Sequence, residues 1–110
     1  MTFPRNEAQL VKRITEAVKA QYPEVWQLKT HGNPYQRAGV PDLLLSVQGR
    51  LLAVEVKHQK PGESVERMLR RLSPRQCIEL ESLRTSGAAT LVAWEVDQVL
   101  DSIKKILEED

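Results

Sequence analysis

A chain of 110 residues with 41% hydrophobic residues is long enough to bury one core, so a single domain over residues 1–110 is expected. A formal net charge of +1 excludes a uniformly basic nucleic-acid-coating protein and a disordered acidic chain. One cysteine and two histidines exclude a disulfide framework and a conventional structural zinc site, and no export signal or membrane-spanning run is present. We therefore expect a cytoplasmic protein with no membrane partner.

The first half of the chain predicts one helix followed by three strands. Residues 6–22 have apolar side chains at helical spacing, with Asn6 as the N-cap and Gln9 as its capping-box partner. Residues 25–31 predict a short strand, and the prolines and glycine of residues 33–41 predict a loop. The next two strands, LLLSV and LLAVEV, flank Gln48 and Gly49.

The second half predicts helices around one further strand. Residues 64–72 form a short amphipathic helix, and residues 73–87 form a longer one with Ser73 as its N-cap. Residues 88–96 then predict a strand and residues 97–110 a C-terminal helix. The fold class is therefore α/β, with a mixed sheet of about four strands flanked by helices. The expected order is α-β-β-β-(α)-α-β-α, with LLLSV and LLAVEV as central strands because both are apolar at nearly every position.

Three charged residues stand at the outer ends of this apolar strand pair. If Gln48 and Gly49 form a two-residue hairpin loop, Asp42 lies opposite Glu55, and Lys57 projects from the same face. Two carboxylates at about 5 Å repel unless one is protonated or a cation lies between them. A hard divalent ion such as Mg²⁺ is one remedy. A three-residue loop would instead turn Asp42 to the other face, and strand ends often carry charges that are simply solvated.

Two further polar residues lie on apolar helix faces. Glu7 falls on the same side of its helix as Ile14, where it either faces a cleft or complements the helix dipole. Gln76 shares a face with Leu80 and is also placed for a capping box with Ser73. One side chain can serve both purposes.

These residues, taken in order, resemble a known family. Glu7, the Gly-Val-Pro-Asp run ending at Asp42, the Glu-Val-Lys run of residues 55–57 and the Ser-Pro-Arg-Gln run ending at Gln76 are similar to a stand-alone VRR-NUC domain, of the PD-(D/E)xK nuclease superfamily. The resemblance extends from Glu7 to about residue 99. The interval between Lys57 and Ser73 is longer than the family pattern leads us to expect.

The resemblance implies a restriction-endonuclease-like fold and a metal-dependent endonuclease acting on DNA, with branched structures such as four-way junctions or flaps as favoured substrates. It implies that Asp42, Glu55 and the main chain of Val56 bind Mg²⁺ or Mn²⁺, with Glu7 as a further ligand. Lys57 would assist the chemistry, and Gln76 would support it. The family also implies a prokaryotic or phage-infected cell and, since a four-way junction needs two cuts, a homodimer.

Phosphate contacts would come from a locally basic segment. Residues 57–75 hold six lysines or arginines and only two glutamates. The candidates for DNA binding are Lys29, His31, Tyr35, Arg37, Lys60, Arg67, Arg70, Arg71 and Arg75. For any single arginine, a solvated helix face is the alternative. The apolar side of the same segment, which includes Met68, is either a dimer interface or part of the core.

Two other functions stay open at this level. A DNA-binding or adaptor module without catalysis would keep the fold and the basic segment, and substitution of Asp42 would change nothing but affinity. A plain interaction domain would neither bind nor cut DNA.

Overall fold

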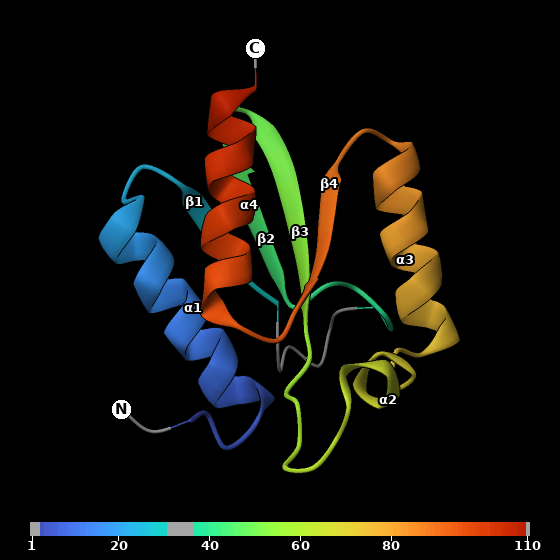
Figure 1. Ribbon diagram of the computed structural model, residues 1–110. Coiled ribbons are helices and arrows are strands. Elements are labelled where there is room, and N and C mark those ends of the chain that lie inside the picture. The colour runs from blue at the N-terminus through green and yellow to red at the C-terminus, as the bar shows by residue number, and fades with distance from the viewer. Residues whose placement is uncertain (1–2, 31–36, 110) are drawn as a thin grey trace.

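The computed structural model describes residues 3–30 and 37–109 of the chain. Its elements follow the predicted order, and Figure 1 shows them as one mixed sheet with helices on either side. No helix in these two ranges is long and apolar enough to cross a membrane. The elements are α1 (Glu7–Gln21), β1 (Trp26–Lys29), β2 (Leu43–Val47), β3 (Arg50–Val56), α2 (Val65–Leu69), α3 (Pro74–Thr85), β4 (Ala89–Ala93) and α4 (Val96–Glu108).

The sheet has the strand order β1-β2-β3-β4, so the two apolar strands are central, as predicted. β1 pairs with β2, and β2 with β3, in antiparallel fashion, whereas β4 runs parallel to β3. Gln48 and Gly49 form a two-residue loop, with φ angles of 49° and 84°. Positive φ at both positions is the signature of a type I′ hairpin turn. The predicted register follows, with Val47 opposite Arg50 and Leu43 opposite Val54.

This register divides the sheet into two unlike faces. One face carries Leu43, Leu45, Leu52 and Val54, which pack with the buried sides of α1 and α4 to form the main core. The other face carries Asp42 and Glu55 and is covered in part by α3, which lies on the opposite side of the sheet from α1 and α4 (Figure 1). The carboxylates are therefore separated from the main core by the sheet itself.

The fourth strand is shorter than the sequence predicts. β4 ends at Ala93, because Gln98 folds back and accepts hydrogen bonds from the backbone N–H groups of Trp94 and Glu95. These bonds form a capping box that starts α4 at Val96, inside the run that alternation assigns to the strand. Local capping thus overrides the apolar pattern of residues 94–96.

Candidate active site

Asp42 is held at the entrance to β2 by contacts from two neighbouring strands. Its carboxylate Oδ2 accepts a hydrogen bond of 2.8 Å from the backbone N–H of Val56 in β3. Extending the β2–β3 register by one residue places Asp42 opposite Glu55. The two acids predicted to be neighbours across the hairpin are therefore brought together.

Thr30 fixes the backbone of Asp42 and was not among the predicted site residues. Its backbone N–H donates to the carbonyl of Asp42 at 2.8 Å, and its hydroxyl donates to the carbonyl of Pro41. Thr30 is buried, so both bonds are shielded from water. A buried threonine directly after the last residue of β1 gives no recognisable signal in the sequence, because the pairing of β1 with β2 decides which carbonyls it meets.

Gly39 lets the loop before Asp42 lie directly against the start of α3. Its φ is 86°, which favours glycine, and a Cβ placed there would be 2.5 Å from Cγ and 2.6 Å from the carbonyl oxygen of Arg75. Close packing and the positive φ thus explain why the Gly-Val-Pro-Asp run begins with glycine. It allows the loop that carries Asp42 to pack against the helix turn that carries Gln76.

Glu55 is the most buried charged group of the site, with 2% of its surface exposed. Its Oε2 accepts a hydrogen bond of 3.0 Å from Gln76 Nε2 and lies 3.9 Å from Lys57 Nζ. Its Oε1 is buried and has no hydrogen-bond donor among the residues described. An ionised carboxylate buried with one bare oxygen is costly, so a proton or a cation is needed at this point.

The pKa of Glu55 is raised to about 8, chiefly by burial and next by the negative charge of Asp42. The ammonium of Lys57 acts in the opposite direction, while a hydrogen bond with Asp42 and the charge of Glu7 add to the rise. Near neutral pH Glu55 therefore holds a proton, unless a cation other than the Lys57 ammonium replaces that proton.

Gln76 performs both of the tasks that its position in the sequence allows. Its side-chain Oε1 accepts from the backbone N–H of Ser73 at 2.8 Å, which completes a capping box at the start of α3. Its Nε2 remains available and donates to Glu55. The cap fixes the amide, and the amide in turn orients the buried carboxylate.

Glu7 lies at the start of α1 and is partly exposed. Its Oε1 is 3.8 Å from Nη1 of Arg71, and its charge contributes to the raised pKa of Glu55. Acidic, histidine and cysteine side chains in the described ranges form no group of three or more placed to hold a metal ion. Glu7 therefore belongs to the surroundings of the Asp42–Glu55 pair and remains only a predicted ligand.

The donor set of the site fits a hard divalent cation. Mg²⁺ is commonly held by one or two carboxylates, with water and substrate phosphate completing its coordination. Asp42 and Glu55 supply two carboxylates, and Oε1 of Glu55 is an acceptor that finds no donor within residues 3–30 and 37–109. The role predicted for the main chain of Val56 stays a prediction; its N–H is already bonded to Asp42.

The predicted DNA-binding residues occupy different settings, and their role stays a prediction. His31 and Tyr35 lie outside the described residues. Arg37 is tied to the buried Glu79 of α3 through two hydrogen bonds, of 2.7 and 3.0 Å, and this ion pair raises the pKa of Arg37. Arg71 is half-buried. The exposed members are Arg37 itself, Lys29, Lys60, Arg67, Arg70 and Arg75.

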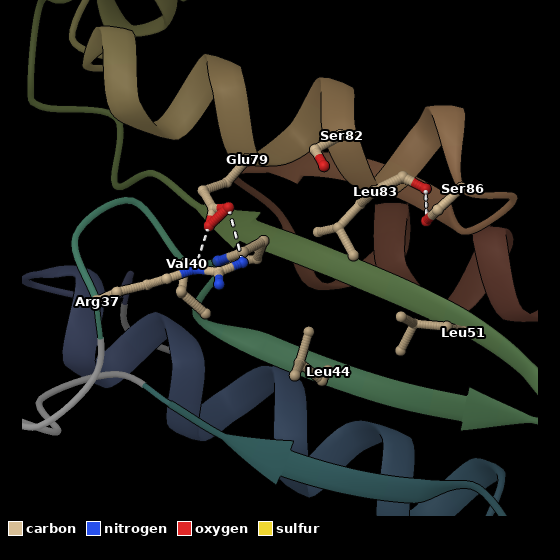
Figure 2. A pocket seen from close by; sticks show the side chains of 9 residues that line it. Arg37, Val40, Leu44, Leu51, Glu79, Ser82, Leu83 and Ser86 are labelled. Atoms are coloured by element: carbon tan, nitrogen blue, oxygen red, sulfur yellow. Dashed lines mark hydrogen bonds and ion pairs between the residues drawn. The ribbon is translucent and has the colours of Figure 1, made fainter.

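A largely apolar groove runs between α3 and the sheet, starting from the loop that precedes Asp42. Figure 2 shows Leu44 and Leu51 on the sheet side and Leu83 on the helix side, with the Arg37–Glu79 ion pair at one end. The ion pair joins the loop to α3 a short distance from Gly39. It thus gives a second fixed contact between the segment that carries Asp42 and the helix that carries Gln76.

The apolar side of residues 64–72 is turned inward. Met68 of α2 is fully buried, while Val65, Leu69 and Leu72 are partly covered. Of the two interpretations of this side, packing within the domain accounts for Met68.

Comparisons with known proteins point to one family. No protein-family model matches the sequence, and no curated protein matches it. Among solved structures, a chain named "VRR_NUC domain protein" is 20% identical with a TM-score of 0.66, over 94% of this chain and 89% of that chain. Another, named "VRR_NUC domain", is 26% identical with a TM-score of 0.57, over 94% and 95% of the two chains. The chain thus shares its fold with these VRR-NUC domains, which confirms the resemblance that its motifs predict.

Proposed function

We propose that this protein is an endonuclease that hydrolyses DNA phosphodiester bonds with the help of Mg²⁺ or Mn²⁺. One observation carries the proposal: Glu55 is buried opposite Asp42 and has an oxygen with no hydrogen-bond donor among the described residues. A structural carboxylate would be expected to have its oxygens satisfied. Two carboxylates that face each other across the hairpin, one of them with this buried oxygen, are suited to hold a cation.

The site residues take separate parts in this reaction. Asp42 and Glu55 would hold the ion, with Val56 and Glu7 as further predicted ligands. When bound, a divalent ion polarises a phosphate oxygen and lowers the pKa of a coordinated water. Lys57, whose ammonium is 3.9 Å from Glu55, would stabilise the negative charge that develops on the phosphate. Gln76 keeps the Glu55 carboxylate in one orientation through its hydrogen bond.

The substrate we propose is branched DNA, such as a four-way junction or a flap, cut by a homodimer. The support is the family resemblance together with the exposed basic residues of the segment between β3 and α3, including Lys60, Arg67 and Arg70. These residues would contact phosphates on either side of the cut. Two copies related by a two-fold axis would suit the near two-fold symmetry of a four-way junction.

The test is cleavage of end-labelled four-way junction, flap and duplex DNA by wild-type protein and Asp42→Asn, with Mg²⁺, Mn²⁺ or EDTA. We expect cleavage that needs the metal and is lost in Asp42→Asn, while the variant still binds DNA. Arg84→Gln, on an exposed arginine paired with Glu81 at the far end of α3, is the matched control. Salt-sensitive binding without Asp42-dependent cleavage of any substrate would reject the enzyme in favour of a DNA-binding module.

A further inference from the structure

Arg71 differs from the other arginines of its segment because its guanidinium is fixed in place. Its Nε and Nη2 donate to the two carboxylate oxygens of Glu63, at 3.0 and 2.9 Å. Its Nη2 also donates to the carbonyl of His58 at 2.6 Å. The bonds between Arg71 and Glu63, together with one from the Lys60 backbone N–H to Glu63, lower the pKa of Glu63 to about 2, and the Glu63 carboxylate raises the pKa of Arg71. The arginine is therefore anchored before any ligand arrives.

The anchoring leaves Nη1 of the guanidinium near Glu7. Nη1 makes no hydrogen bond to any residue in the described ranges, and its near neighbour is Glu7 Oε1 at 3.8 Å. The charge of Glu7 in turn contributes to the raised pKa of Glu55. The side chain of Arg71 is 30% exposed, so these two N–H groups are open to a ligand from solvent. Lys57, in contrast, is almost completely buried against Glu55.

We propose that Arg71, through Nη1, binds a phosphate of the nucleic-acid strand that enters the site. A planar guanidinium whose Nη1 is close to Glu7 but makes no hydrogen bond in the described ranges matches phosphate oxygens. A side chain already held by three hydrogen bonds loses little rotamer freedom on binding. This inference rests on the proposed function, because that function supplies the DNA ligand. It assigns to Arg71 a phosphate at the site itself, whereas the exposed basic residues would contact the flanking strand.

A purely structural role is the alternative that the experiment must separate. Arg71 joins the β3–α2 connection to the start of α1, and a second bond, between His58 Nε2 and the carbonyl of Pro4 at 2.7 Å, links the same two segments. If Arg71 were only such a link, its replacement would lower stability without changing how binding depends on salt.

The binding experiment uses Asp42→Asn as the background, so that DNA is bound and not cut. Affinity for a fluorescent four-way junction and a duplex is measured against NaCl concentration for Arg71→Gln, Arg71→Lys and the control Arg84→Gln. For Arg71→Gln we expect binding about tenfold weaker and a slope of log K against log salt reduced by about 1. Arg71→Lys should keep the slope and lose part of the affinity. A slope in Arg71→Gln equal to that of Arg84→Gln overturns the proposal.

A second measurement avoids substitution and so does not depend on the folding of a variant. Phenylglyoxal modifies accessible arginines, and peptide mass spectrometry reports the rate at each position with and without DNA. We expect DNA to protect Arg71 and leave Arg84 reactive; equal rates at Arg71 with and without DNA count against the proposal. Both measurements read binding alone, so protein that binds through Arg71 but never cuts DNA rejects the nuclease function and keeps this inference.

Discussion

Replacing Glu55 by glutamine removes a buried negative charge while keeping the size of the side chain and an amide able to hydrogen-bond. The pKa of Glu55 is raised from an ordinary 4.5 to about 8, chiefly by burial. When a folded-state pKa lies above the unfolded one, the protonated group stabilises the fold below pH 4.5, and that contribution is lost as pH rises to about 8. At about 1.4 kcal/mol for each pKa unit, the loss is on the order of 5 kcal/mol.

The measurement is urea unfolding, followed by circular dichroism at pH values from 5 to 9 in EDTA, for wild-type protein and Glu55→Gln. We expect wild-type stability to fall relative to the variant across this range, so that Glu55→Gln is the more stable protein at pH 9. Other titrating groups, such as Glu63, contribute equally to both proteins and cancel in the difference. Parallel curves would refute the assignment of a buried, protonated Glu55.

The same pair of proteins tests the metal. A divalent cation must displace the proton from Glu55, so stabilisation of the wild type by Mg²⁺ or Mn²⁺ should grow between pH 6 and 8. Glu55→Gln should gain little from either ion at any pH. Equal metal-induced shifts in melting temperature for both proteins would show that the ion binds elsewhere.

Three further substitutions test the packing that positions the site. Thr30→Val leaves the Pro41 carbonyl without its buried donor, so we expect the free energy of unfolding to fall by about 1–3 kcal/mol and Mg²⁺ to stabilise the variant less. Thr30→Ser should restore both, and unchanged urea curves for Thr30→Val would contradict this. Gly39→Ala places a methyl group against Arg75 at a positive φ, and a loss of about 1–3 kcal/mol in the same assay is expected. Met68→Ala should cost about 2–5 kcal/mol without changing the sedimentation coefficient, whereas dissociation of an oligomer would identify an interface instead.

The local elements could be predicted because their signals lie within a few residues of one another. Asn6 caps α1 and Ser73 caps α3 as expected, since an N-cap side chain bonds only two or three residues ahead. The hairpin is equally local: two loop residues determine which side chains of β2 and β3 share a face. The pairing of Asp42 with Glu55 could therefore be inferred from the sequence alone.

Contacts between segments distant in the sequence could not be predicted in the same way. The sequence predicts the same role for Arg37 and Arg71, as exposed cations that bind DNA. In the structure, Arg37 pairs with Glu79, 42 residues away, and Arg71 pairs with Glu63 and with Glu7 at the start of α1. Their partners depend on how α3 and the β3–α2 connection pack. No spacing rule in the sequence connects such residues.

The sequence by itself determined the order of helices and strands, the register of the central hairpin and the set of acids and lysine at its end, because turn chemistry and side-chain alternation act over short distances. Only the tertiary structure decided how Asp42 is held by Thr30 and the Val56 amide, and that Glu55 retains an oxygen without a donor in the described part of the chain. Burial and hydrogen-bond satisfaction are properties of the packed whole, since each depends on every segment that excludes water from the site.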